Sequence, residues 1–158
     1  MTEATAKQLL KRSGFKKATP TTKVTSIIAK LQSTHDAVFI FQGDQFLGIV
    51  NLYHSFLGKR VNPQQKVDAC LYHPPVLAPE TPAIEIARLM VESRIYRLPV
   101  LRKDQFLGVV FAEDLLRWAR KLPLFKISIE LNQRLFFTSF QGLSLEVRSP
   151  FRFAEVCF

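Results

Sequence analysis

The chain has 158 residues, of which 47% are hydrophobic, and this is enough for one ordinary domain or two small domains that share a core. Its net charge is +9, and its two cysteines, Cys70 and Cys157, are far apart. These features exclude a disulfide-stabilised scaffold, and no apolar run reaches the roughly eighteen residues of a membrane helix. We see no signal peptide and expect a cytoplasmic protein.

The first segment, residues 1–14, is basic. Its residues 3–13 predict an amphipathic helix that turns Ala4, Leu9 and Leu10 inward. The basic residues of the chain concentrate here and near residue 120: they are Lys7, Lys11, Arg12, Lys16, Lys17, Arg117, Arg120 and Lys121. Such a surface attracts polyanions, but no helix-turn-helix, zinc or aromatic-basic pattern accompanies it. A basic adaptor for nucleic acid therefore stays an alternative function.

Two copies of one unit follow, at a constant offset of sixty residues. The stretch from Asp44 to Val50 reads Asp-Gln-Phe-Leu-Gly-Ile-Val, and the stretch from Asp104 to Val110 repeats it with one change, Val for Ile. Apolar positions outside this stretch match at the same offset. The repeat therefore predicts two copies of a whole fold module, related by a pseudo-twofold rotation that makes Gly48 equivalent to Gly108.

Each copy predicts the same elements. The first has a short strand at 15–18, an amphipathic helix at 24–31, a hairpin at 37–50 and a second helix at 52–58. The second has a strand at 76–77, a helix at 84–91, a hairpin at 98–110 and a helix at 112–121. In the first helix of each copy we expect Val24, Ile27, Ile28 and Leu31, and Ile84, Ala87, Met90 and Val91, to form the buried face.

The starts of these two helices carry cap signals. Thr21 and Thr22 precede the first helix, and Thr81 with Pro82 precedes the second, where we expect a hydroxyl cap. The order of elements is β-α-β-β-α in each copy. The fold class is therefore α/β, more closely α+β, with two modules that share one core.

The last segment, residues 123–158, has another character. Apolar residues alternate with polar ones over 125–131 and again over 143–147, a period of two that predicts two strands. Seven of the fourteen phenylalanines lie here. We expect a β-rich tail that covers an apolar patch, packs on a partner chain or begins a further domain.

The second copy resembles the cystathionine β-synthase (CBS) domain. Its stretch from Ser93 to Val100, Ser-Arg-Ile-Tyr-Arg-Leu-Pro-Val, is followed by Leu-Gly-Val-Val at 107–110 and Asp-Leu-Leu at 114–116, as in that family. The first copy departs from the pattern, with Ala37 before Val38 and with His54 in the acidic position. Two such modules in series, at 15–62 and 63–122, resemble a CBS pair, or Bateman module.

The sequence contains no catalytic or metal-binding pattern. His35, His54 and His73 lack metal-ligand spacing, and there is no phosphate-binding glycine loop, nucleophile elbow or zinc-protease motif. Cys70 lies among apolar residues, as a small buried side chain does. We therefore expect no enzymatic activity and no bound metal.

The resemblance implies a regulatory module that binds an adenosine-containing ligand, such as AMP, ADP, ATP or S-adenosylmethionine, in the cleft between the two CBS modules. It places the ribose acceptor at Asp114 and a phosphate contact at Arg97, whose planar donors suit paired oxygens. Phe111 stands where a hydroxyl residue is usual, and Asn51 and His54 occupy the matching positions of the first copy. The remaining expected contacts are Val76, Ala78, Tyr96, Leu98 and Pro99.

We expect one nucleotide per chain, because His54 cannot replace a carboxylate. We also expect a homodimer, as in that family, and a regulated partner protein that the sequence does not identify. The helix residues expected to supply the dimer surface are Leu52, Phe56, Leu57, Leu115 and Trp118. The alternative from another class is a structural or dimerisation module whose pockets bind nothing.

Overall fold

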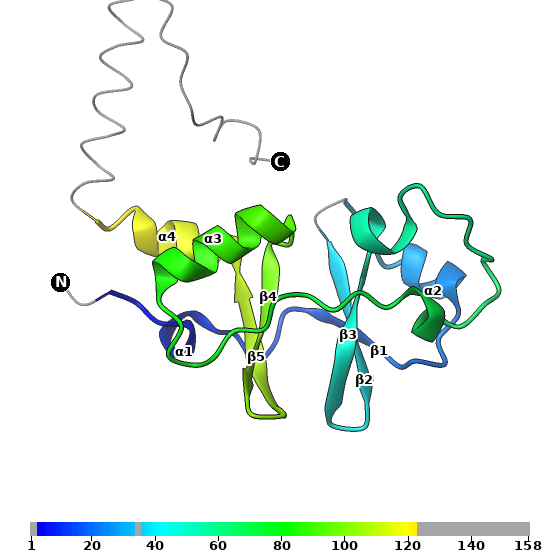
Figure 1. Ribbon diagram of the computed structural model, residues 1–158, viewed down its shortest axis with the longest axis horizontal. Coiled ribbons are helices and arrows are strands. Elements are labelled where there is room, and N and C mark those ends of the chain that lie inside the picture. The colour runs from blue at the N-terminus through cyan, green and yellow to red at the C-terminus, as the bar shows by residue number, and fades with distance from the viewer. Residues whose placement is uncertain (1–2, 34–35, 123–158) are drawn as a thin grey trace, which may run out of the picture. The chain divides into compact units, whose positions relative to one another are not determined.

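The computed structural model describes residues 3–33 and 36–122 (Figure 1). Both hairpins lie in one compact unit that ends at Trp118. The expected tail strands, together with His35 and Cys157, lie outside the described residues. The elements, in chain order, are α1 Ala6–Leu9, β1 Lys16–Ala18, α2 Val24–Ile28, β2 Ala37–Gln42, β3 Gln45–Asn51, the π-helical turn η1 Leu52–Phe56, the 3₁₀ turn η2 Val67–Cys70, α3 Ala83–Ser93, β4 Arg97–Arg102, β5 Gln105–Phe111 and α4 Ala112–Ala119.

The two hairpins have the same register at an offset of sixty residues, which confirms the predicted repeat. Ile40 of β2 pairs with Gly48 of β3, and Val100 of β4 pairs with Gly108 of β5. The same irregularity follows in both, directly after Ile40 and Val100. β1 adds a parallel strand to the first hairpin, whereas the corresponding segment of the second copy contributes a single bridge from Leu77 to Val100.

α1, α2 and α4 are shorter than the sequence predicts, whereas α3, at Ala83–Ser93, is longer than the predicted 84–91. Neither α2 nor α3 has a side-chain cap. Before α3, the Thr81 hydroxyl accepts a hydrogen bond of 3.0 Å from the Ala78 amide instead. The carboxylate of Glu3 accepts from the Ile84 amide at 3.2 Å, so an acidic group from the first segment lies at the amino end of α3. The predicted cap at Thr81 is therefore wrong.

The buried face of α3 also differs from the prediction. Ala83, Ile86 and Met90 point into the core, while Ile84 and Val91 are 72% and 66% exposed. The helix begins one residue before the predicted start, and its apolar positions are numerous enough to allow either choice of face. Two apolar side chains predicted to be buried therefore lie on the surface.

The buried apolar residues form two clusters, and the first hairpin contributes to both. The larger cluster surrounds β4 and β5 and includes Phe39 of β2, while the smaller one joins α2 to the other face of β2 through Val38 and Ile40. Rings from both copies meet between the hairpins, where the centroids of Phe41 and Phe106 are 4.9 Å apart in an edge-to-face arrangement. The alternation of side chains along β2 thus joins the two modules in one core.

Several expected surface residues belong to these clusters. Leu115 is buried, and Phe56 and Trp118 pack against the clusters, whereas Leu57 remains exposed. The expected dimer surface is therefore wrong in part, because Leu115 contributes to the core. Cys70 is buried as a free thiol, as predicted.

Each module receives a segment that precedes the other one (Figure 1). In the first segment, Lys11 exchanges two backbone hydrogen bonds of 2.8 and 2.9 Å with Val109 of β5. In the linker between the copies, Tyr72 exchanges two of 2.9 Å with Ile49 of β3. We call residues 4–11 and 67–72 the crossing segments.

The glycine of each repeat explains how these segments approach. A Cβ atom on Gly108 would lie 2.5 Å from the Lys11 carbonyl oxygen, and one on Gly48 would lie 2.9 Å from the Tyr72 carbonyl oxygen. Neither distance is possible for a real side chain. Glycine inside a strand thus allows close approach of a second backbone, and it does so twice.

Among the described residues no helix is both long and apolar enough to cross a membrane. The same part of the chain holds no cluster of histidine, cysteine or carboxylate groups that could bind a metal ion.

Candidate functional site

The structure brings the expected ribose and phosphate residues of the second copy together. Arg97 begins β4 and pairs in register with Phe111, which ends β5. Asp114 follows in the first turn of α4, because the helix begins directly after the strand. The guanidinium carbon of Arg97 lies 5.3 Å from the Phe111 ring centroid, in cation–π contact. A carboxylate, an aromatic ring and a cation therefore lie close to one another at this end of the hairpin.

Asp114 is held in place by two cations. Its side chain is only 10% exposed, and Arg117, one turn later, donates a hydrogen bond of 2.9 Å to Oδ1. Nζ of Lys11 lies 2.8 Å from Oδ2, an ion pair without hydrogen-bond geometry, and 5.4 Å from the Phe111 ring centroid. Lys11 comes from the first crossing segment. The sequence analysis did not include it in the site.

Arg97 has a carboxylate partner as well. Its guanidinium pairs with Asp36, the residue before β2, and Lys16 pairs with the other oxygen of the same carboxylate. Burial acts to raise the pKa of Asp36, but hydrogen bonds from Lys16 and the Gln32 amide, with the charges of Arg97 and Lys16, lower the pKa below its ordinary value. Asp36 is therefore ionised at neutral pH and connects the two modules at Arg97.

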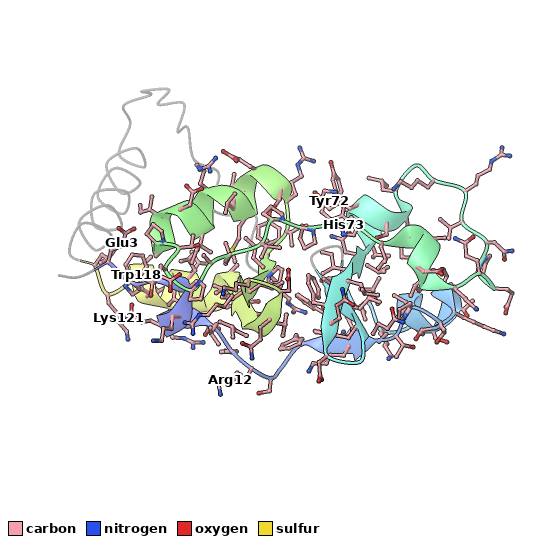
Figure 2. The ribbon with its side chains drawn as sticks, turned by 60° about the horizontal axis from the view of Figure 1, so that its bottom comes forward. Glu3, Arg12, Tyr72, His73, Trp118 and Lys121 are labelled. Carbon is pink, nitrogen blue, oxygen red and sulfur yellow. The ribbon has the colours of Figure 1, made fainter. Side chains whose placement is uncertain are left out.

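The matching positions of the first copy are occupied by protein groups. The Asn51 side chain accepts a 2.8 Å hydrogen bond from the His54 amide, at the start of η1. The His54 ring stacks on Tyr72 with centroids 3.9 Å apart, and its Nε2 lies 2.7 Å from the Ser93 carbonyl oxygen. Tyr72 is labelled in Figure 2, next to His73. Because a carbonyl only accepts, Nε2 carries the proton. His54 thus joins η1 to the end of α3 and offers no acceptor comparable to Asp114.

The expected adenine contacts differ in exposure. Val76 and Ala78 are exposed, whereas Leu98 is fully buried in the core and Pro99 is buried beside it. The Tyr96 carbonyl accepts a hydrogen bond of 2.9 Å from the Ala112 amide, which fixes the start of α4. Val76 and Ala78 are therefore the accessible apolar groups of this set, whereas Leu98 belongs to the core.

A groove of about 1110 Å³ lies at the other end of the hairpins. It is lined by Lys17 and Thr19, by the rings of Phe41 and Phe106, and by residues of both hairpin turns, Gly43, Asp44, Gln45, Asp104 and Gln105. In the register of the second hairpin the turn is at Arg102 and Gln105, whereas Arg97 and Phe111 are at the opposite end. This groove is therefore separate from the Asp114 group.

Two residues of the site were missed by the sequence analysis, Lys11 and Asp36. Both contact the second copy from elsewhere in the chain, and their spacing from Asp114 and Arg97 gives no local signal. The glycines at positions 48 and 108 were the available hint, because glycine within a strand indicates close approach of another backbone.

The two modules, each with a hairpin between helical segments, have the architecture of a CBS domain pair. The family profile of the CBS domain matches residues 68–121, so that this part of the chain is a CBS domain. No curated protein sequence matches the chain. The predicted resemblance and fold class are confirmed, and the described chain has the fold of a CBS domain pair.

Solved structures support the fold over most of the chain. The CBS domains of a transcriptional regulator from Streptococcus pneumoniae are 21% identical, with a TM-score of 0.54, and the match covers 72% of this chain and 98% of that one. The CBS pair domain of a putative Mg²⁺ transporter from Shewanella oneidensis MR-1 is 19% identical, with a TM-score of 0.60 and coverage of 77% and 72%. CBSX2 in complex with AMP is 20% identical, with a TM-score of 0.57 and coverage of 73% and 95%.

Proposed function

We propose that this CBS pair is a non-catalytic regulatory module that binds one adenosine-containing ligand beside the start of α4 and transmits the bound state to a partner protein. The observation that carries the proposal is Asp114, a carboxylate only 10% exposed at the amino end of a helix. A carboxylate accepts two hydroxyl donors at once, as a ribose offers. The similar protein CBSX2, solved with AMP, agrees with this choice of ligand.

The surrounding charges suit a phosphate. Arg97 and Lys11 both lie within 5.4 Å of the Phe111 ring centroid. The Arg97 side chain is 24% exposed, so part of it remains accessible while Asp36 holds the guanidinium. The exposed Val76 and Ala78 supply apolar surface for an adenine ring. These groups together provide the three contacts that an adenine nucleotide needs.

The first copy supports a single ligand per chain. Its acidic position is His54, which is already stacked on Tyr72 and bonded to the Ser93 carbonyl. A nucleotide there would have to replace both contacts and would meet no carboxylate. We therefore propose one nucleotide, bound by the second copy.

A thermal-shift series with AMP, ADP, ATP and S-adenosylmethionine tests the proposal. A ligand at a hundredfold excess over its dissociation constant stabilises the folded state by about 2.7 kcal/mol. Asp114→Asn and Arg97→Gln should each weaken AMP binding by about 1.5 to 3 kcal/mol, the range for hydrogen bonds to charged groups. Glu113→Gln is the matched control, because Glu113 is exposed and adjacent to Asp114.

The second candidate function is a structural or dimerisation module. The observation in its favour is that Asp114 and Arg97 already have protein partners, Lys11 and Arg117 for the former and Asp36 for the latter. Absence of any thermal shift with the four ligands would support this candidate. We propose a homodimer in either case, with the exposed Ile84 and Val91 of α3 as its apolar contacts.

A further inference from the structure

The first crossing segment places Lys11 at a fixed position over the second copy. Its amide donates to the Val109 carbonyl at 2.8 Å, and its carbonyl accepts from the Val109 amide at 2.9 Å. The missing side chain of Gly108 leaves room for this contact. The backbone of Lys11 is therefore positioned by β5, while its side chain is 49% exposed and free to change partner.

The Lys11 side chain reaches two groups of the proposed site. Nζ lies 2.8 Å from Oδ2 of Asp114 and 5.4 Å from the Phe111 ring centroid, the same ring that Arg97 contacts at 5.3 Å. Asp114 retains Arg117 as a second cation on Oδ1. Removing the ammonium from Oδ2 thus leaves the carboxylate paired, so that exchange does not strand a buried charge.

Resting on the function proposed above, we propose that Lys11 selects for the phosphorylated form of the ligand. In the free protein its ammonium pairs with Asp114. When ribose hydroxyls take Oδ2, the ammonium leaves that oxygen and pairs with the phosphate of the same ligand. A nucleoside without phosphate displaces the ammonium and offers it no anion, so its binding bears a cost that AMP binding does not.

The charges of the site agree with this exchange. Lys11, Lys16, Arg97 and Arg117 face two carboxylates, Asp114 and Asp36, so that two positive charges are in excess. A phosphate monoester carries between one and two negative charges at neutral pH. The ligand therefore offsets the excess, whereas adenosine does not.

The test compares AMP and adenosine by isothermal titration on the full chain. Lys11→Met should weaken AMP binding about tenfold, because a charge-assisted contact to phosphate is lost. The same variant should bind adenosine as well as the unmutated protein or more tightly. Lys11→Arg should keep the preference for AMP. Lys7→Met is the matched control, since Lys7 is exposed on the same segment and should leave both affinities unchanged.

The outcomes separate the two proposals. If the unmutated protein binds AMP and Lys11→Met alters both affinities equally, the selective role of Lys11 is overturned and the nucleotide site stands. If the unmutated protein binds neither ligand, the proposed function fails and the role of Lys11 falls with it. Lys11→Gln provides the same comparison with a polar side chain, and circular dichroism checks that each variant is folded.

Discussion

Replacing Gly108 with alanine tests the close approach of the first crossing segment to β5. The added Cβ would lie 2.5 Å from the Lys11 carbonyl oxygen and 2.8 Å from Cδ1 of Leu10. The leucine side chain can rotate away. The carbonyl cannot move freely, because it accepts the 2.9 Å hydrogen bond from the Val109 amide.

The molecule can respond in two ways, and both lower its stability. If the segment stays, overpacking against the backbone costs about 1 to 3 kcal/mol. If it detaches, two backbone hydrogen bonds are lost, at about 0.5 to 1.5 kcal/mol each, and Ala4 and Ala6 leave the core. We therefore expect Gly108→Ala to lower the free energy of unfolding by about 2 kcal/mol. Gly48→Ala should cost less, since its Cβ would lie 2.9 Å from the Tyr72 oxygen.

Urea unfolding followed by circular dichroism measures these differences, and trypsin reports on the segment. Cleavage after Lys7 and Arg12 should accelerate in Gly108→Ala but not in Gly48→Ala. Gly58→Ala is the control for backbone strain alone, because Gly58 has a φ of +72° and nothing within 4 Å. If Gly108→Ala stays within about 0.5 kcal/mol of the unmutated protein and is cleaved no faster, the close approach is refuted.

Three further predictions follow from other contacts. Asp36→Asn should lower the free energy of unfolding by about 2 kcal/mol at pH 7. Hydrogen bonds and ion pairing lower the pKa of Asp36, so the stability that its charge contributes is fully present above the ordinary pKa of 3.8. This contribution is lost as the pH falls through the folded-state pKa. The free energies of unfolding of Asp36→Asn and of the unmutated protein should therefore converge in acid. Lys103→Gly should raise the free energy of unfolding by about 0.5 to 1 kcal/mol in urea titrations, since Lys103 has a φ of +54° in a hairpin turn; an unchanged or lower stability would contradict the strain. Sedimentation at micromolar concentration should show a dimer that the double variant Ile84→Asp and Val91→Asp dissociates; a monomeric unmutated protein would contradict the proposed contacts.

The hairpins were predictable because their signals are local. The short apolar and β-branched runs, the polar turns and the repeated Gly-apolar-apolar ending specify strand, turn and register together. The helices were less predictable, because α3 has apolar residues on more than one face and only the packing decides which is buried. Ile84 and Val91 show this, since they have the apolar character of a core residue and lie exposed.

The site was predictable where one stretch of sequence contains it. Arg97, Phe111 and Asp114 follow from the second hairpin and the helix after it, and the structure brings them together. Their partners Asp36 and Lys11 come from 61 and 103 residues away and depend on how the modules pack. Charge pairing at such separations depends on how the chain folds, so the local spacing of residues does not predict it.

The crossing segments have a consequence for how such a chain can be divided. If the chain were cut between the repeats, before residue 67, each piece would lack one contact. The second piece would contain β5 without Lys11, and the first would contain β3 without Tyr72. A polypeptide with one repeat and its preceding segment would be complete only when two copies exchange those segments reciprocally. The tandem chain is thus equivalent to a segment-swapped pair of identical units whose ends have been joined, and fusion converts a concentration-dependent association into an intramolecular one.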